Sequence, residues 1–236
     1  MNTHVFLITA KTNLHVGNES GGDFSIIDKA IQRDPLTGLP CINSSSLKGA
    51  INEFCSKWAD SCLRGDENAE LRKRLFGSDK TGKEKDSQKG EAIFFDAKLL
   101  FLPQQSDKDE GEPYTLKTSK AVIDMMNERV GLFCPGFKYE CEKEKQISHE
   151  LFKSICSDDN LPIIARNVLD NGESKNLWYE QVLPAETVLY TIIQEEGEVL
   201  ANALDGKIVQ IGAGATIGYG YCKFNLYETI EGTKED

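Results

Sequence analysis

The sequence contains no long uncharged apolar run. A membrane-spanning helix needs roughly 20 consecutive apolar residues, and no stretch of the 236 residues approaches that length. The first ten residues carry no basic segment followed by a long apolar stretch, the pattern that a secretory signal requires. We therefore expect a cytoplasmic protein that is not secreted and has no membrane partner.

Motifs of several enzyme and metal-binding classes are also missing. The seven cysteines form no C-x-x-C pair, so neither a zinc ribbon nor a disulfide framework is indicated, and we expect structural thiols in a reducing compartment. The three histidines are scattered, and no H-E-x-x-H or G-x-S-x-G motif occurs. A zinc metalloprotease and an α/β-hydrolase are therefore disfavoured.

Positive charge is scarce. The chain has 27 Lys and Arg against 38 Asp and Glu, which gives a net charge of −11 at pH 7. Nonspecific binding to nucleic acid depends on neutralising phosphates with cations. A basic surface over the whole protein is thus excluded, and any nucleic-acid site must be local.

The apolar residues that are present predict several strands. Residues 4–10 and 187–194 are rich in β-formers and predict buried strands. A further strand is expected over 92–102, with a break near Asp96, and a closing strand over 219–227. These strands mix with helices without regular βαβ repetition, which indicates the α+β class with loop insertions.

Helical periodicity is clearest after residue 44. Apolar residues recur there at helical spacing, with Ser44 to Ser46 as candidate N-caps and Trp58 as a candidate core anchor. Helices are also expected over 119–129, 145–156 and 198–204. Residues 165–186 predict two β-like arms around the tight turn 170–172. Residues 11–43 predict a long loop or a loop-hairpin, and residues 77–90 predict a mobile loop.

Two segments have compositions suited to anions. The loop 209–220 has four glycines in nine residues, which lets backbone N–H groups approach phosphate oxygens; a purely structural glycine hairpin is an equal alternative. Ser44 to Lys48 combine hydroxyls, helix N-terminal amides and an ammonium, although a serine cap with a solvated lysine is the simpler interpretation. Asp28, in a loop, offers a carboxylate to Mg²⁺ or to a proton.

The order of these motifs is familiar. Residues 14–17, 27–34, 37–42 and 45–49, followed by the glycine loop at 212–220, resemble the RAMP superfamily of CRISPR proteins over nearly the whole chain. The Ile-Asp-x-x-Ile-Gln-Arg pattern that begins at Ile27, together with residues 177–186, looks most like the backbone subunits of type III-B Cmr effector complexes. The type III-A Csm backbone subunits are the near neighbours.

The resemblance implies a fold and a set of partners. The fold is a ferredoxin-like, RRM-like palm with an inserted thumb hairpin at about 165–186 and loop insertions, in a single RAMP domain over 1–236. Copies of the chain are expected to stack into a helical filament along CRISPR RNA, together with other Cmr subunits, and to bind single-stranded target RNA.

The resemblance also assigns roles to individual residues. Asp28 matches the aspartate that cleaves target RNA with a divalent metal, so it is the expected catalytic residue and the ligand of Mg²⁺ or Mn²⁺. The nucleophile is the 2′-OH of the RNA itself, and the product is a 2′,3′-cyclic phosphate. The residues expected to bind RNA are His15, Gly17, Arg33, Ser45, Ser46, Lys48, Arg166, Gly212, Gly214 and Gly218.

Three other functions remain open on the sequence. The first is a scaffold that stacks on guide RNA without cutting it. The second is an enzyme that binds a small molecule or phosphate in the glycine loop and the serine-rich helix start. The third is an endonuclease that matures guides with His15 as general base.

Overall fold

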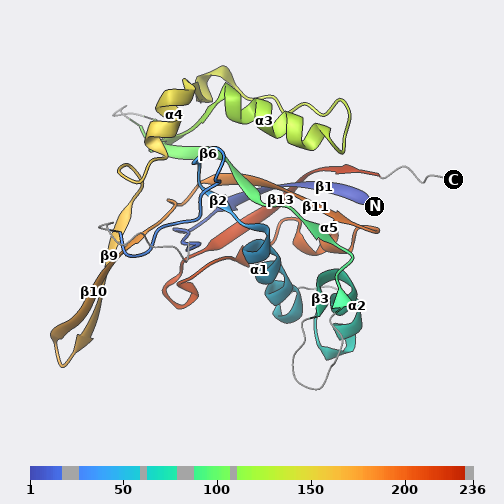
Figure 1. Ribbon diagram of the computed structural model, residues 1–236, viewed down its shortest axis with the longest axis horizontal. Helices are drawn as coiled ribbons and strands as arrows, with labels where there is room; N and C mark the ends of the chain where they lie inside the picture. The colour runs from blue at the N-terminus through green and yellow to red at the C-terminus, as the bar shows by residue number, and fades with distance from the viewer. Residues whose placement is uncertain (18–26, 59–62, 79–87, 107–110, 232–236) are drawn as a thin grey trace.

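A mixed β-sheet organises the molecule, and a two-stranded hairpin projects from it (Figure 1). The computed structural model describes residues 1–17, 27–58, 63–78, 88–106 and 111–231. The strands are β1 (Asn2–Ala10), β2 (Cys41–Ile42), β3 (Gly77–Ser78), β4 (Gln88–Lys89), β5 (Ile93–Phe94), β6 (Ala97–Gln105), β7 (Tyr114–Ser119), β8 (Gln146–Ile147), β9 (Ile163–Asp170), β10 (Glu173–Gln181), β11 (Val188–Glu195), β12 (Ile208–Gln210) and β13 (Tyr221–Ile230). The helices are α1 (Ser44–Lys57), α2 (Ala69–Phe76), α3 (Lys120–Gly131), α4 (His149–Ile155) and α5 (Val199–Leu204).

Strand β1 lies at the centre of the main sheet, antiparallel to both β11 and β13. The order across the sheet is β12-β13-β1-β11-β6-β7-β8, with β2 paired to β6 and β5 to β11. Helices α3 and α4 lie on one side of the sheet, and α1, α2 and α5 on the other (Figure 1). The α+β class is confirmed.

The predicted strands are confirmed because their apolar residues are buried along their length. Six of the nine residues of β1 are buried and the other three are half-buried. Strand β11 is buried at seven of its eight positions. The predicted break near Asp96 separates β5 from β6. The closing strand β13 begins at Tyr221, two residues later than predicted.

Helix α1 has the predicted apolar face but different ends. Its buried residues are Leu47, Ile51, Phe54 and Cys55. Trp58 is 69% exposed, so its assignment to the core is wrong: it follows the last helical residue, where the chain has left the helical path. The serine caps are wrong as well, because the carboxylate of Asp96, and not a serine hydroxyl, accepts the Ser44 N–H at 2.8 Å.

The helix predicted over 145–156 is shorter than expected. Lys143–Lys145 form a 3-10 turn, and Gln146–Ile147 pair in parallel with the end of β7 as β8. Helix α4 therefore begins only at His149, with Ser148 as its N-cap. The long-range partner of β8 overrides the local helical pattern.

The hairpin of β9 and β10, called the thumb below, forms where two arms around a turn were predicted. Asn171 and Gly172 have positive φ, as a tight hairpin turn requires. Its arms end at Gln181, so residues 182–186 belong to the body and not to the hairpin. The thumb projects away from the sheet (Figure 1).

Both segments that were predicted as loops contain short strands, and the mobility predicted for 77–90 stays a prediction. At the end of 11–43, Cys41–Ile42 form β2, which pairs with β6. Within 77–90, β3 and β4 pair with each other, and residues 79–87 lie outside the described residues. Within 11–43, isolated bridges such as Leu14 to Leu183 and Gly17 to Ile31 hold the described residues in place, and 18–26 lie outside them.

The thiols are structural, as predicted. The six cysteines in the described ranges are free, and Cys62 lies outside those ranges. Burial raises the pKa of Cys156 and Cys222 to about 12, so both stay protonated. Among the helices of the described residues, none is long and apolar enough to cross a membrane.

Candidate nucleic-acid interface

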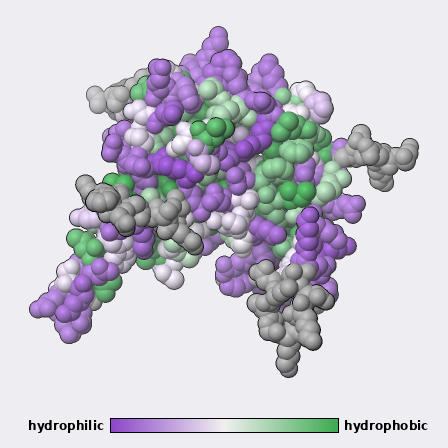
Figure 2. All heavy atoms as spheres, viewed as in Figure 1, coloured by the Kyte–Doolittle hydropathy of each residue, from purple (hydrophilic) through white to green (hydrophobic). Residues whose placement is uncertain are grey.

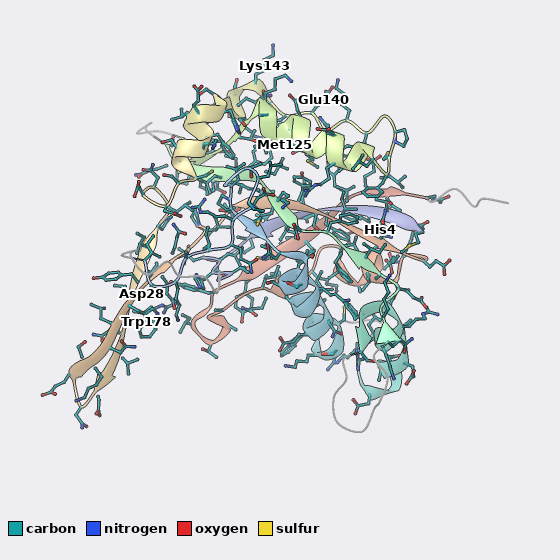
Figure 3. All side chains as sticks on the ribbon, viewed as in Figure 1. His4, Asp28, Met125, Glu140, Lys143 and Trp178 are labelled. Carbon is teal, nitrogen blue, oxygen red and sulfur yellow. The ribbon has the colours of Figure 1, made fainter. Side chains whose placement is uncertain are left out.

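The loop that carries Asp28 is joined to the inner end of the thumb by main-chain hydrogen bonds. The N–H groups of Asp28 and Lys29 both donate to the carbonyl of Tyr179 at 3.1 Å, and the Gln181 N–H donates to the Lys29 carbonyl at 3.0 Å. The Tyr179 N–H in turn donates to Oδ2 of Asp28 at 2.7 Å. Strand β10 thus positions the loop, and Asp28 lies beside Trp178 at the base of the thumb (Figure 3).

The Asp28 carboxylate is exposed to solvent. Its Oδ2 accepts the Tyr179 N–H, which fixes the direction in which the carboxylate points. A fixed carboxylate at the surface is accessible to a ligand or substrate, as a catalytic group must be.

Next to Asp28, the buried carboxylate of Glu180 gathers several donors. Its Oε1 accepts hydrogen bonds from Lys29 Nζ at 2.9 Å and from Trp178 Nε1 at 2.8 Å, and its Oε2 accepts one from Arg166 Nε at 3.2 Å. Burial alone raises the pKa of Glu180, but the indole N–H and the two cations outweigh it and lower the pKa to about 2. Glu180 is therefore ionised at neutral pH, with both oxygens engaged.

Arg166 connects this cluster to the glycine-rich loop. Its guanidinium carbon lies 4.7 Å from the centre of the Tyr219 ring, a cation–π contact. Lys29 Nζ makes a similar contact with the ring of Trp178 at 4.9 Å. The Asp28 loop, the thumb and the glycine loop therefore meet at Glu180.

His15 is buried, at 3% exposed. Its Nδ1 lies 2.7 Å from the carbonyl oxygen of Gln181, and because a carbonyl only accepts, Nδ1 carries the proton. Its own carbonyl accepts the Ala213 N–H at 2.9 Å. His15 thus links the end of β10 to the glycine loop, and its contact with RNA stays a prediction.

The glycine loop packs its backbone tightly against the His15 segment. A Cβ on Gly212 would overlap the His15 carbonyl oxygen, and Gly212 has φ +79°. Gly214 and Gly218 flank the 3-10 turn Ala215–Ile217, both in the left-handed region. The N–H groups of five residues in the loop already donate to carbonyls of the chain, so these five are not free to bind phosphate: Ala213, Ile217, Gly218, Tyr219 and Gly220.

A polar recess of about 290 Å³ brings three of the predicted residues together. Its lining residues are Val16, Gly17, Gln32, Ser46, Ala50, Glu53, Gln210 and Gly212. Gln32 holds the recess together: its Nε2 donates to the Gly17 carbonyl at 3.2 Å and to Ser46 Oγ at 3.1 Å, and its Oε1 accepts the Asn43 N–H at 2.7 Å.

The remaining predicted residues differ in accessibility. Ser45 is exposed in the first turn of α1, and Lys48 is half-buried, with its Nζ 5.8 Å from the centre of the Phe94 ring. Arg33 lies outside the recess and donates to Asp158 Oδ1 and to the carbonyls of Gly38 and Cys156. These bonds give Arg33 a structural role, and its binding to RNA stays a prediction.

Sequence reasoning missed Lys29, Gln32 and Glu180 as members of the site. Lys29 and Glu180 are separated by 151 positions, so no local pattern relates them. One signal was present: Glu180 is a carboxylate two residues before the apolar pair Val182 and Leu183, where the chain enters the core. A charge at such a point needs partners.

The fold and this site define an α+β palm that carries a thumb hairpin, a docked acidic loop and a glycine-rich loop. A family model described as RAMPs, the RAMP superfamily, matches residues 7–223. The chain therefore belongs to the RAMP superfamily.

Two curated relatives are similar in sequence. The CRISPR system Cmr endoribonuclease Cmr4 of Pyrococcus furiosus is 24% identical over 287 residues, which cover 92% of this chain and 93% of the relative. The CRISPR system Cms endoribonuclease Csm3 of Streptococcus thermophilus is 32% identical over 95 residues, which cover 39% of this chain and 42% of the relative.

Two solved structures are similar in fold, each at 19% sequence identity. A chain of the type III-B Cmr-beta complex bound to cognate target RNA has a TM-score of 0.71, covering 94% of this chain and 96% of that one. Oligomeric Cmr4 from Pyrococcus furiosus has a TM-score of 0.68, covering 99% of this chain and 100% of that one. These matches confirm the predicted ferredoxin-like palm.

Proposed function

We propose that this chain is the backbone subunit of a type III-B CRISPR effector complex. It binds CRISPR RNA, stacks with copies of itself and with other Cmr subunits, and cleaves bound complementary RNA in the cytoplasm. The relative matched over 92% of the chain is named as an endoribonuclease. The observation that carries the proposal is the exposed Asp28 carboxylate, fixed by the Tyr179 N–H at the base of the projecting thumb.

The surface of the thumb supports a role in contacts with other molecules. Its outer part is mostly hydrophilic (Figure 2), yet apolar side chains are also exposed along it. Those at least one-third exposed are Ile163, Val168, Leu177 and Tyr179. A hairpin that leaves apolar residues unburied on its own chain is suited to insertion between other molecules, such as RNA strands and a neighbouring subunit.

The acidic net charge is compatible with RNA binding because the cations near the site are local. Lys29 and Arg166 lie at the thumb base with Asp28, and the family resemblance adds Lys48 on α1. A strip of cations on one face binds phosphates while the other faces stay acidic. Stacking of copies would join these strips along the guide.

The proposed reaction uses a nucleophile within the RNA. The 2′-OH attacks the adjacent phosphorus, the bond from phosphorus to the 5′-oxygen breaks, and a 2′,3′-cyclic phosphate forms. The departing 5′-oxygen takes a proton from water and becomes a 5′-OH. Asp28 accepts the proton of the 2′-OH, and the thumb holds the target nucleotide splayed so that attack occurs in line. Because positioning contributes much of the rate, we expect an isolated subunit to cleave slowly.

The donors at Asp28 fit a divalent metal that is shared with the substrate. The described residues include no group of three or more His, Cys, Asp or Glu able to hold a metal by themselves. Mg²⁺ is commonly held by one or two carboxylates together with substrate phosphates and water. Asp28 would therefore hold Mg²⁺ or Mn²⁺ jointly with the RNA, where the ion would supply charge stabilisation at the phosphate.

The alternatives from the sequence have less support. The polar recess has a glutamate and no Lys or Arg among its lining residues, which disfavours a phosphate-binding enzyme centred on it. A guide-maturing nuclease would use His15 as general base, but His15 is buried with Nδ1 bonded to a carbonyl. A scaffold that does not cut remains the competing function.

The test is cleavage of a labelled RNA complementary to the guide, in the assembled complex, with Mg²⁺ or with EDTA. We expect wild type to produce regularly spaced cuts, and Asp28→Asn to bind RNA without cutting it. Asp124→Asn, which alters an exposed aspartate on α3, away from the thumb (Figure 1), is the matched control and should cleave normally. Equal cleavage by wild type and Asp28→Asn would exclude Asp28, and binding without any cleavage would identify a scaffold.

A further inference from the structure

Asp28 is not the only charged residue at the base of the thumb. Within the described residues, two cations and one buried carboxylate lie beside it: Lys29, Arg166 and Glu180. Glu180 has an 11% exposed side chain, whereas Lys29 is 52% exposed. The carboxylate is thus enclosed while the ammonium remains open to solvent and to any bound substrate.

Glu180 is unsuited to proton transfer or metal binding. Both of its oxygens accept hydrogen bonds, and its pKa is about 2, so it carries no proton and has no free oxygen directed to solvent. What it does is hold Lys29 in one place. The contact of Lys29 with the Trp178 ring restricts the lysine from a second direction.

A phosphate that approaches Asp28 needs such a cation. The Asp28 carboxylate repels the phosphodiester, and the repulsion grows when the phosphorus becomes five-coordinate and gains negative charge. An ammonium has three donors, and Lys29 uses one of them on Glu180 in the contacts that the structure describes. Its other donors are available to a phosphate oxygen.

We propose that Lys29 is the cationic partner of Asp28 in RNA cleavage and that Glu180 is the residue that positions it. The inference rests on the proposed function. Lys29 contacts the phosphate beside the attacked bond and stabilises the charge that develops there. Fixed donors directed at developing charge are among the strongest contributors to catalysis.

Glu180 also links this pair to the rest of the site. Through Arg166 and the Tyr219 ring, the carboxylate that holds Lys29 also holds the thumb against the glycine loop. A change in the thumb that moves Arg166 would therefore alter the partners of Glu180 and the position of Lys29. The cleavage rate should therefore depend on the contacts of Arg166 with Glu180 and with the Tyr219 ring.

The experiment measures single-turnover cleavage and binding of a fluorescent target RNA by the assembled complex. The variants are Lys29→Gln, Lys29→Arg, Glu180→Gln and Asp28→Asn. Lys120→Gln is the matched control, since Lys120 is an exposed lysine on α3, away from the thumb (Figure 1), and is paired with a carboxylate, Asp124 Oδ2, at 2.6 Å.

We expect Lys29→Gln to lower the cleavage rate roughly 100-fold while target affinity stays within about threefold, the loss expected of one phosphate contact. Lys29→Arg should recover much of the rate because it restores the charge. Glu180→Gln should lower the rate about tenfold without a matching loss of affinity, whereas Lys120→Gln should cleave as wild type does. A merely structural role of Lys29 would not separate rate from affinity in this way.

Two results would overturn the inference, and they are distinguishable. If wild type cleaves, Asp28→Asn does not, and Lys29→Gln cleaves within twofold of wild type, the inference fails while the proposed function stands. If wild type itself does not cleave complementary RNA, the proposed function fails and the inference fails with it.

Discussion

Strands β10 and β11 follow one another along the chain but differ in what stabilises them: β11 is mostly buried and β10 mostly exposed. Seven of the eight residues of β11 are buried in the sheet, whereas β10 is buried only at its last positions, Glu180 and Gln181. The palm is stabilised by apolar burial along whole strands. The thumb is anchored at its root by directional polar contacts, and the root is where the candidate site lies.

This difference predicts that the two regions respond to different kinds of change. Removal of apolar volume should destabilise the protein strongly when it is made in the palm and little when it is made in the thumb. Loss of charge should affect the root of the thumb. Backbone crowding should affect the glycine loop that contacts it. Four substitutions or matched pairs test these expectations.

The largest effect is expected in the palm. Phe6 and Phe224 are fully buried, with their ring centroids 6.0 Å apart. Phe224→Ala should lower the free energy of unfolding by about 3–5 kcal/mol, measured by urea denaturation. Leu177→Ala on the thumb, where Leu177 is 52% exposed, should change it by less than about 0.5 kcal/mol. Equal losses would show that the thumb is packed like the palm.

The next effect is a pH dependence at the root of the thumb. The folded-state pKa of Glu180, about 2, lies below its ordinary 4.5, so its stabilisation is present above pH 4.5 and is lost as pH falls toward 2. Glu180→Gln should remove about 2–3 kcal/mol of this dependence. Denaturant titrations at pH 2 to 6 would reveal it as a flatter curve. An unchanged pH dependence in Glu180→Gln would contradict a stabilising role of the ionised Glu180 carboxylate.

A smaller effect separates two glycines with nearly the same backbone conformation. Gly212 and Gly218 have φ of +79° and +80°, but a Cβ on Gly212 would overlap the His15 carbonyl, whereas a Cβ on Gly218 would meet open space. Gly218→Ala should cost about 1 kcal/mol, the left-handed penalty alone, and Gly212→Ala about 2–3 kcal/mol. Thermal unfolding of both variants gives the comparison, and equal costs would show that the loop readjusts.

The smallest effect concerns the start of α1. Asp96→Ala removes the acceptor of the Ser44 N–H and should cost about 1 kcal/mol, or about 2–4 °C in Tm. Asp124→Ala, which removes an exposed partner of Lys120 on α3, is the control and should cost less. If both variants melt alike, Asp96 is not acting as a cap.

The sequence was sufficient where the structure depends on neighbours along the chain. The apolar run at residues 4–10 and the helical spacing from Leu47 to Cys55 predicted β1 and α1, because periodic burial is a local property. It failed at Trp58, since exposure at a helix end depends on where the helix stops. It also failed at 146–147, where the parallel partner in β7 lies almost 30 residues away.

The candidate site was predictable in a similar measure. The family resemblance placed a hairpin where β9 and β10 form and named Asp28 as the candidate catalytic residue, a role that stays a prediction. The structure brings Gly17, Ser46 and Gly212 to one recess. The sequence did not predict the contact between Lys29 and Glu180, because these residues meet only when β10 docks on the Asp28 loop. Pairings between distant positions are set by tertiary structure and leave no spacing in the sequence.

Gln32 gives the recess a chemical polarity. Its amide nitrogen faces the Gly17 carbonyl and its amide oxygen faces the Asn43 N–H, so each end of the group meets the complementary end of a peptide. A glutamate of the same size would direct a carboxylate oxygen at the Gly17 carbonyl, and a lysine would offer no acceptor to Asn43. Gln32 thus aligns its own segment with those of Gly17 and of Asn43 to Ser46 through an amide whose two ends cannot be exchanged, so among side chains of this length the recess requires one donor and one acceptor.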